Sequence, residues 1–185
     1  EHFAAVAQAA GEVAGPSHRE YGTVGGNLCL DTRCVFYNQS EWWRAANNYC
    51  LKYRGEICHV APGGKKCFAA FSGDVAPALL LFDAEVEIAG PDGRRRMPLA
   101  DLYRNDGMDH LTLRPGELLV AIHVAKLTTS ISSAPIASAY AKSRIRGSID
   151  FPLAGVAVAM AVAGGKITDL RIALTGVSPL PFLAK

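Results

Sequence analysis

The first hydrophobic pattern along the chain has the period of a helix. Between residues 2 and 14, apolar side chains recur every three or four positions. Gly15-Pro16 interrupts this pattern, because proline cannot donate the hydrogen bond that continues a helix. We therefore predict a helix over residues 2–14. A second, shorter apolar run occupies residues 76–81.

The period then changes to that of β-strands. Residues 84–88 alternate between apolar and polar positions, and Pro91-Asp92-Gly93 predicts a turn that leads into residues 94–99. Together these segments predict a hairpin. A further strand is predicted over residues 118–124, after the turn at Pro115-Gly116.

The C-terminal part of the sequence predicts antiparallel strands. They are expected at residues 138–142, 156–162 and 167–174, with Gly164-Gly165 as a hairpin turn. A segment rich in serine and threonine at residues 126–134 is typical of a linker. We therefore expect a mixed α+β chain with one domain over residues 1–125 and a second over residues 134–185.

The composition narrows the classes of function. Half of the residues are apolar, and the formal net charge is only +2, without the clustered basic face of a nucleic-acid-binding protein. Apolar stretches are too short or too interrupted to span a membrane, and no signal peptide is visible. The sequence predicts a soluble, cytoplasmic protein. Because it opens on Glu1 without an initiating methionine, we also expect a fragment.

Four of the five cysteines lie in one aromatic-rich segment, residues 31–73, which predicts a metal site. Cys34, Cys50, Cys58 and Cys67 are separated by 15, 7 and 8 residues, gaps too wide for zinc-ribbon or bacterial ferredoxin motifs. Buried, reduced cysteines without a metal are the alternative. We expect Cys29 to be a small core residue, not a ligand.

The surroundings of these cysteines fit a negatively charged site. Residues 31–73 contain six Lys or Arg residues and three acidic ones, so basic neighbours could offset four thiolates and steer an acidic electron donor. His59 could also ligate a metal, although a surface position beside Cys58 is the simpler interpretation. Aromatic residues that could form an apolar wall are Phe36, Tyr37, Trp42, Trp43, Tyr49, Tyr53, Phe68 and Phe71.

A second candidate site is the segment Gly22-Thr23-Val24-Gly25-Gly26-Asn27. Two adjacent glycines let backbone N–H groups approach an anion, and the side chains of Thr23 and Asn27 offer further donors. This arrangement suits a diphosphate. The segment matches neither the Rossmann fingerprint nor a P-loop.

Residues 21–28, 73–88, 113–122 and 149–159 together resemble the FAD-binding subunits of the xanthine dehydrogenase and carbon monoxide dehydrogenase family. The resemblance implies the second half of a PCMH-type FAD-binding domain, followed by the start of an α+β C-terminal domain with an antiparallel sheet. It also implies a preceding half-domain that grips FAD from the other side. The insertion at residues 31–73 is similar to that of 4-hydroxybenzoyl-CoA reductase β-subunits, in which such a loop carries a [4Fe-4S] cluster.

The resemblance assigns roles to individual residues. It implies FAD contacts from Thr23, Val24, Gly25, Gly26, Asn27, Asp74 and Lys142, and cluster ligation by Cys34, Cys50, Cys58 and Cys67. Asp74 could instead cap a helix over residues 76–81, and Lys142 could be a solvated strand residue. No residue is a candidate acid, base or nucleophile for a substrate.

The function that the resemblance implies is electron transfer. Electrons from a reduced ferredoxin would pass through the [4Fe-4S] cluster and FAD to partner subunits that carry [2Fe-2S] centres and the molybdenum cofactor, for reductive dehydroxylation of 4-hydroxybenzoyl-CoA. An alternative is the FAD subunit of an aldehyde, xanthine or carbon monoxide dehydrogenase-type complex. A further alternative is a non-enzymatic, zinc-binding scaffold.

Overall fold

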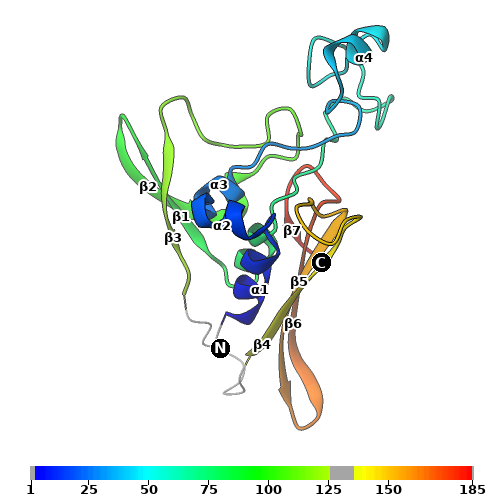
Figure 1. Cartoon of the computed structure of the whole chain (residues 1–185). Helices are drawn as coiled ribbons and strands as arrows, with labels where there is room; N and C mark the ends of the chain where they lie inside the picture. The colour runs from blue at the N-terminus through cyan, green and yellow to red at the C-terminus, as the bar shows by residue number, and fades with distance from the viewer. Residues whose placement is uncertain (1–2, 126–135, 185) are drawn as a thin grey trace.

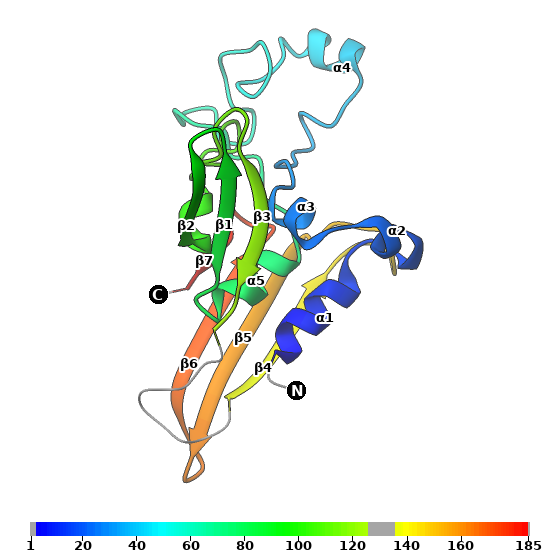
Figure 2. The same ribbon diagram turned by 90° about the vertical axis from the view of Figure 1, so that its left-hand side faces the viewer.

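The computed structural model describes residues 3–125 and 136–184. They form two antiparallel sheets with helices between them (Figures 1 and 2). The helices are α1 (Ala4–Glu12), α2 (Pro16–Tyr21), α3 (Val24–Leu28), α4 (Glu41–Ala46), α5 (Val75–Leu80) and the short 3-10 helix η1 (Leu99–Leu102). The strands are β1 (Glu85–Gly90), β2 (Gly93–Pro98), β3 (Leu118–His123), β4 (Ile136–Ser143), β5 (Ala154–Ala163), β6 (Lys166–Thr175) and β7 (Phe182–Leu183). The predicted linker at residues 126–134 lies outside the described residues.

The first sheet has the strand order β2-β1-β3. Its β1–β2 hairpin pairs Glu85 with Pro98 at one end and Gly90 with Gly93 at the turn, which confirms the predicted hairpin. Gly93 has φ +107°, a conformation that is open to glycine and strained for other residues. The third predicted strand is β3, which pairs with the other edge of β1.

The second sheet has the order β4-β5-β6-β7 and contains the three strands predicted for the C-terminal part. The inner face of this sheet carries small residues, among them Ala157 and Ala173, both fully buried. On the same sheet, α1 packs mainly on β4, and its Ala5 and Ala9 are fully buried. The helix predicted over residues 2–14 is therefore α1, shorter at both ends.

One buried cluster joins the two sheets. All six residues of α5 are buried, and this helix lies between the sheets (Figure 2). Phe71, Leu28 and Phe82 belong to the same cluster, which also includes residues of both sheets. The mixed α and β content and the antiparallel sheets confirm the predicted fold class, whereas the division into domains at residues 1–125 and 134–185 stays a prediction.

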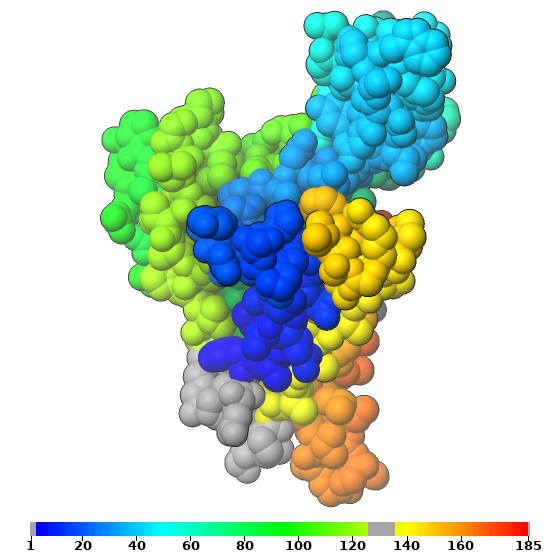
Figure 3. Space-filling view, viewed as in Figure 1, coloured from blue at the N-terminus to red at the C-terminus, as the bar shows by residue number. Residues whose placement is uncertain are grey.

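The insertion, residues 31–73, extends from the body as a separate lobe around α4 (Figures 1 and 3). It is mostly irregular, as expected. Its two ends are held together by a pair of backbone hydrogen bonds of 2.8 Å, in which Arg33 and Ala70 each donate to the other. No helix among residues 3–125 and 136–184 is long and apolar enough to cross a membrane.

Candidate functional site: a cofactor cavity and a four-cysteine lobe

The glycine-rich segment begins a short helix, α3, which the sequence did not predict. Thr23 is its N-cap, and the Thr23 side chain accepts a hydrogen bond of 3.0 Å from the backbone N–H of Gly26. The N–H groups of Val24 and Gly25 belong to the first turn and so have no acceptor within the helix. A Cβ at Gly26 would lie 3.1 Å from the Thr23 hydroxyl, so glycine keeps this helix start tightly closed.

Asn27 connects α3 to the start of α5. Its side-chain oxygen accepts a hydrogen bond of 3.0 Å from the backbone N–H of Val75, the first residue of α5. Gly73 makes this approach possible, because a Cβ there would lie 2.7 Å from the Asn27 carbonyl oxygen. Asn27 thereby satisfies one of the backbone N–H groups at the start of α5 that have no partner within the helix. Asp74 occupies the N-cap position of α5 but makes no capping hydrogen bond with its side chain.

Asp74 instead forms a buried polar cluster with two residues of β4. Tyr140 donates a hydrogen bond of 2.7 Å to its Oδ1, and the Lys142 ammonium donates one of 3.0 Å to its Oδ2. The side chains of Asp74 and Lys142 are only 5% and 1% exposed, so Lys142 is not a solvated residue. Lys142 also donates to the backbone carbonyl of Glu12, at 3.0 Å.

Burial sets the ionisation of this cluster. It raises the pKa of the Asp74 carboxyl, while the Tyr140 hydroxyl and the Lys142 ammonium act in the opposite direction. The pKa of Tyr140 is raised strongly by burial and by the neighbouring carboxylate, so its hydroxyl keeps its proton and serves as a donor. The cluster fixes the start of α5 against β4 and α1.

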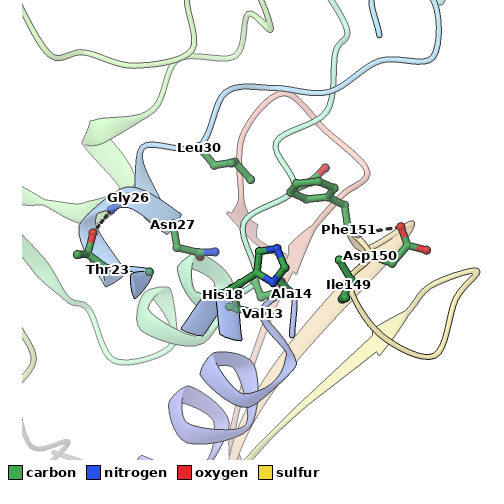
Figure 4. A pocket seen from close by; sticks show the side chains of 13 residues that line it. Val13, Ala14, His18, Thr23, Gly26, Asn27, Leu30, Ile149, Asp150 and Phe151 are labelled. Carbon is green, nitrogen blue, oxygen red and sulfur yellow. Dashed lines mark hydrogen bonds between the residues drawn. The ribbon is translucent and has the colours of Figure 1, made fainter. Parts of the chain in front are cut away.

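A cavity of about 380 Å³, a size typical of small-molecule sites, opens beside these elements (Figure 4). Of the residues that the sequence assigned to FAD, the cavity is lined by Thr23, Gly26, Asn27 and Asp74. Val24, Gly25 and Lys142 are not part of its lining. Lys142 would therefore act on a ligand in this cavity through Asp74.

The wall of the cavity opposite α3 is formed by residues that were not predicted as site residues. Ile149, Asp150 and Phe151 lie across from Thr23 and Gly26, and His18 of α2 lies between them (Figure 4). The pKa of Asp150 is lowered to about 2 by hydrogen bonds from Arg146, so this carboxylate is charged at neutral pH. Residues 149–151 are in an irregular loop after β4, so periodicity could not indicate their place; the family resemblance of residues 149–159 was the available signal.

The structure brings all four predicted cysteine ligands to one small cavity in the lobe. Cys34, Cys50, Cys58 and Cys67 line it together, although they span more than thirty positions of the sequence. Cys50, Cys58 and Cys67 are 7%, 5% and 4% exposed. Cys29 is not part of this lining; it is half-buried and lies outside the buried core, so the expectation of a core residue is only partly met.

A strained turn positions Cys50. Asn48, Tyr49 and Arg54 have φ values of 55°, 57° and 61°, in the left-handed region that non-glycine residues rarely adopt. Gly55 closes the turn, since a Cβ there would lie 2.6 Å from the Cys50 backbone nitrogen. Such strain persists only where surrounding contacts or a ligand hold it.

Cys67 is held by several polar contacts. Its backbone N–H donates to Asp106 at 3.2 Å, its carbonyl accepts from Gly107 at 2.8 Å, and its sulfur accepts from the Ala69 N–H at 3.4 Å. Burial raises the pKa of the Cys67 thiol, whereas the Ala69 N–H and the Lys52 ammonium favour the thiolate. Among residues 3–125 and 136–184, no three Cys, His, Asp or Glu side chains are arranged to hold a single metal ion.

The predicted aromatic wall is only partly correct. Phe36 and Tyr37 line the cysteine cavity, together with His59. Trp42, in contrast, is 79% exposed, and Phe71 is fully buried in the main core, where it packs on Tyr103. Phe71 was assigned to the wrong site because the end of the insertion returns into the body before residue 73.

The fold is that of the FAD-binding subunits of molybdenum-containing dehydrogenases. The solved structure of carbon monoxide dehydrogenase from Hydrogenophaga pseudoflava matches with a TM-score of 0.66 and 25% sequence identity, over 98% of this chain and 47% of that chain. A quinoline 2-oxidoreductase from Pseudomonas putida 86 shares the fold at 17% identity, with a TM-score of 0.60 over 93% of this chain and 44% of that chain.

Comparison of the sequence with known proteins identifies the same family. The family model "FAD binding domain in molybdopterin dehydrogenase" matches residues 1–126. Escherichia coli (strain K12) aldehyde oxidoreductase FAD-binding subunit PaoB is 34% identical over 173 residues, covering 89% of this chain and 51% of that protein. The carbon monoxide dehydrogenase medium chain of Afipia carboxidovorans is 31% identical over 137 residues, covering 73% of this chain and 42% of that protein.

The chain therefore belongs to the family of FAD-binding subunits of molybdenum hydroxylases, of the aldehyde, xanthine and carbon monoxide dehydrogenase type. It spans about half the length of these relatives or less.

Proposed function

We propose that this chain is part of an electron-transfer subunit that binds FAD in the cavity beside α3 and a [4Fe-4S] cluster at the four cysteines of the insertion. The convergence of Cys34, Cys50, Cys58 and Cys67 on one cavity carries the second half of this proposal. When bound, the two cofactors would supply electron transfer between a donor or acceptor and partner subunits with [2Fe-2S] centres and the molybdenum cofactor.

The cavity beside α3 has the chemistry that FAD requires. Thr23 and Asn27 line the cavity, and the Thr23 hydroxyl and the Asn27 side-chain amide are hydrogen-bond donors that suit the diphosphate. Asp74 is held in one orientation by Tyr140 and Lys142, so its carboxylate is a fixed acceptor for a hydroxyl or N–H group of the cofactor. The resemblance implies a preceding half-domain that would complete the site.

The cysteine cavity suits a cluster. Each iron of a [4Fe-4S] cluster takes one protein thiolate, so the four sulfurs are set wider apart than the ligands of a single zinc ion. The backbone N–H of Ala69 donates a hydrogen bond to the Cys67 sulfur, and hydrogen bonds of this kind help to set the reduction potential of iron–sulfur clusters.

Metal analysis and one pair of variants test the cluster. Anaerobically purified protein should contain iron and acid-labile sulfide in equal amounts, whereas stoichiometric zinc without sulfide would support the scaffold alternative. Cys50→Ser should abolish the cluster absorbance, because it removes one of the four ligands. Cys29→Ser should retain it. Equal loss in both variants would show that the ligand set is wrong.

Two overall reactions are candidates for the complete complex. Aldehyde oxidation is favoured by the 34% identity to an aldehyde oxidoreductase subunit, in an alignment that covers 89% of this chain. Reductive dehydroxylation of 4-hydroxybenzoyl-CoA, with ferredoxin as the donor, is favoured by the resemblance of the four-cysteine insertion. Incubating the purified complex with an aromatic aldehyde and an electron acceptor, or with reduced ferredoxin and the acyl-CoA, separates them. The cytoplasmic location stays a prediction.

A further inference from the structure

Lys52 is a buried cation beside the four cysteines. Its side chain is only 7% exposed, although it belongs to a lobe that extends into solvent. It lines the same cavity as the cysteines, and its ammonium lies 5.1 Å from the centre of the Tyr37 ring. Lysines are rarely buried to this degree, because removing an ammonium from water costs several kcal/mol unless hydrogen bonds replace the water.

Fixed oxygen atoms surround this ammonium. Its three N–H groups face four oxygen atoms within hydrogen-bond distance: the Asp31 carboxylate at 2.7 Å, the Thr32 hydroxyl and carbonyl at 2.5 and 3.0 Å, and the Gly107 carbonyl at 3.1 Å. Only Asp31 carries a charge, and its side chain is 64% exposed, so solvent screens much of its field. The positive charge of Lys52 is therefore incompletely neutralised on the side of the cysteine cavity.

No other Lys, Arg, Asp or Glu among the described residues lines this cavity. His59 does, and its Nε2 contacts the backbone carbonyl of Tyr49. Among the other basic residues of the lobe, Arg44 and Arg54 pair with Glu41, and Arg33 stacks on Phe151. The Arg44 guanidinium also lies 5.5 Å from the centre of the Tyr37 ring, on the edge of the cysteine cavity.

We propose that Lys52 is the internal counter-charge of the four-cysteine site and raises the midpoint potential of the [4Fe-4S] cluster bound there. The inference rests on the proposed function. Reduction adds one negative charge to the cluster, and a fixed positive charge in a poorly solvated position stabilises the reduced state more than the oxidised state. The reduction potential of the cluster would thus depend on a buried charge inside the lobe. The exposed lysines of the lobe would act separately, on the docking of a partner.

The test is a redox titration of the anaerobically purified complex, monitored by electron paramagnetic resonance. Lys52→Gln removes the charge and keeps a hydrogen-bond donor. Its cluster potential should fall by about 59 mV or more, a tenfold change in the equilibrium of a one-electron couple. Lys52→Arg, which keeps the charge, should stay near the wild-type potential. Lys65→Gln, at an exposed lysine of the same lobe, is the matched control and should shift little.

The outcomes separate the inference from the function on which it rests. Wild-type protein without iron and sulfide would overturn both. A wild-type cluster whose potential is unchanged by Lys52→Gln would overturn the inference alone, as would equal shifts in Lys52→Gln and Lys65→Gln. If Lys52→Gln contains no cluster while Lys52→Arg retains one, the charge is needed for assembly and the inference is supported. Loss of the cluster in both variants would assign Lys52 a packing role and overturn it.

Discussion

Replacing Lys142 by methionine should destabilise the protein strongly. The variant leaves the Asp74 carboxylate, 5% exposed, without the ammonium that now lies 3.0 Å away. Tyr140 would remain as a hydrogen-bond donor, at 2.7 Å, but it cannot supply the missing charge. Removing one partner of a buried ion pair costs about 3–5 kcal/mol. We expect a loss of that size in the free energy of unfolding, measured by urea denaturation at neutral pH.

A surface ion pair provides the matched control. Arg104 pairs with Asp109, with side chains that are 46% and 67% exposed, so Arg104→Met should cost about 0–1 kcal/mol. The double variant Asp74→Asn/Lys142→Met removes both charges and should recover part of the loss, because no uncompensated carboxylate remains. A cost for Lys142→Met no larger than that for Arg104→Met would refute the conclusion that the pair is desolvated.

The loss should also depend on pH. Burial raises the pKa of Asp74 in the folded state above its unfolded value, so the folded state binds the proton more tightly. The contribution of such a group to stability is present at low pH and is lost as the pH rises through the folded pKa. Lys142 opposes this rise, and its removal shifts the pKa of Asp74 further upward. The destabilisation by Lys142→Met should therefore shrink on acidification; a loss that grows instead would contradict the assignment.

Three further variants test the close approach at Gly73, the surface of the lobe and the base of the lobe. Gly73→Ala should lower the free energy of unfolding by about 1–3 kcal/mol in urea denaturation, because its Cβ would lie 2.7 Å from a backbone oxygen. At Gly63 a Cβ would meet nothing within 4 Å, so Gly63→Ala is the control and should leave the stability nearly unchanged. Lys65→Glu should slow the reduction of the protein by an acidic electron donor by up to about tenfold at low salt, and by little at high salt. Lys166→Glu, on the distant β5–β6 hairpin, is the control and should leave this rate unchanged. Arg33→Met removes a cation–π contact and should cost about 1 kcal/mol of stability; an unchanged unfolding midpoint would show that this contact is dispensable.

The strands and the grouping of the four cysteines were predictable from the sequence because their signals are local, whereas metal ligation by these cysteines stays a prediction. Alternation of apolar residues and a Pro-Asp-Gly turn were sufficient to locate the β1–β2 hairpin. The cysteines were identified by their number within one segment, and the structure brings the four expected ones together while Cys29 stays apart. Spacing could not reveal how the lobe wraps around them, since this depends on strained residues such as Tyr49 and Arg54 that carry no sequence signal.

The helix α3 could not be predicted, because two glycines in five residues disfavour a helix. Contacts with the rest of the protein override this propensity: Thr23 caps the first turn, and Asn27 bonds to the start of α5, nearly fifty positions away. The burial of Lys142 was missed for a similar reason. A lysine in an alternating strand is expected to be solvated, and only the packing of β4 on α1, with Asp74 at the start of α5 beside it, buries this lysine.

The base of the lobe joins the two candidate sites physically. Arg33 bonds to Ala70 through two backbone hydrogen bonds, and its guanidinium lies 3.8 Å from the centre of the Phe151 ring, which lines the cavity beside α3. Cys34 follows Arg33 directly, so one of the four cysteines is next in sequence to a residue that contacts the cavity wall. Under the proposed function, a lobe inserted at this point would add an electron-transfer site without changing the two sheets, because its two ends, at Arg33 and Ser72, meet the wall while α4 extends away from the body.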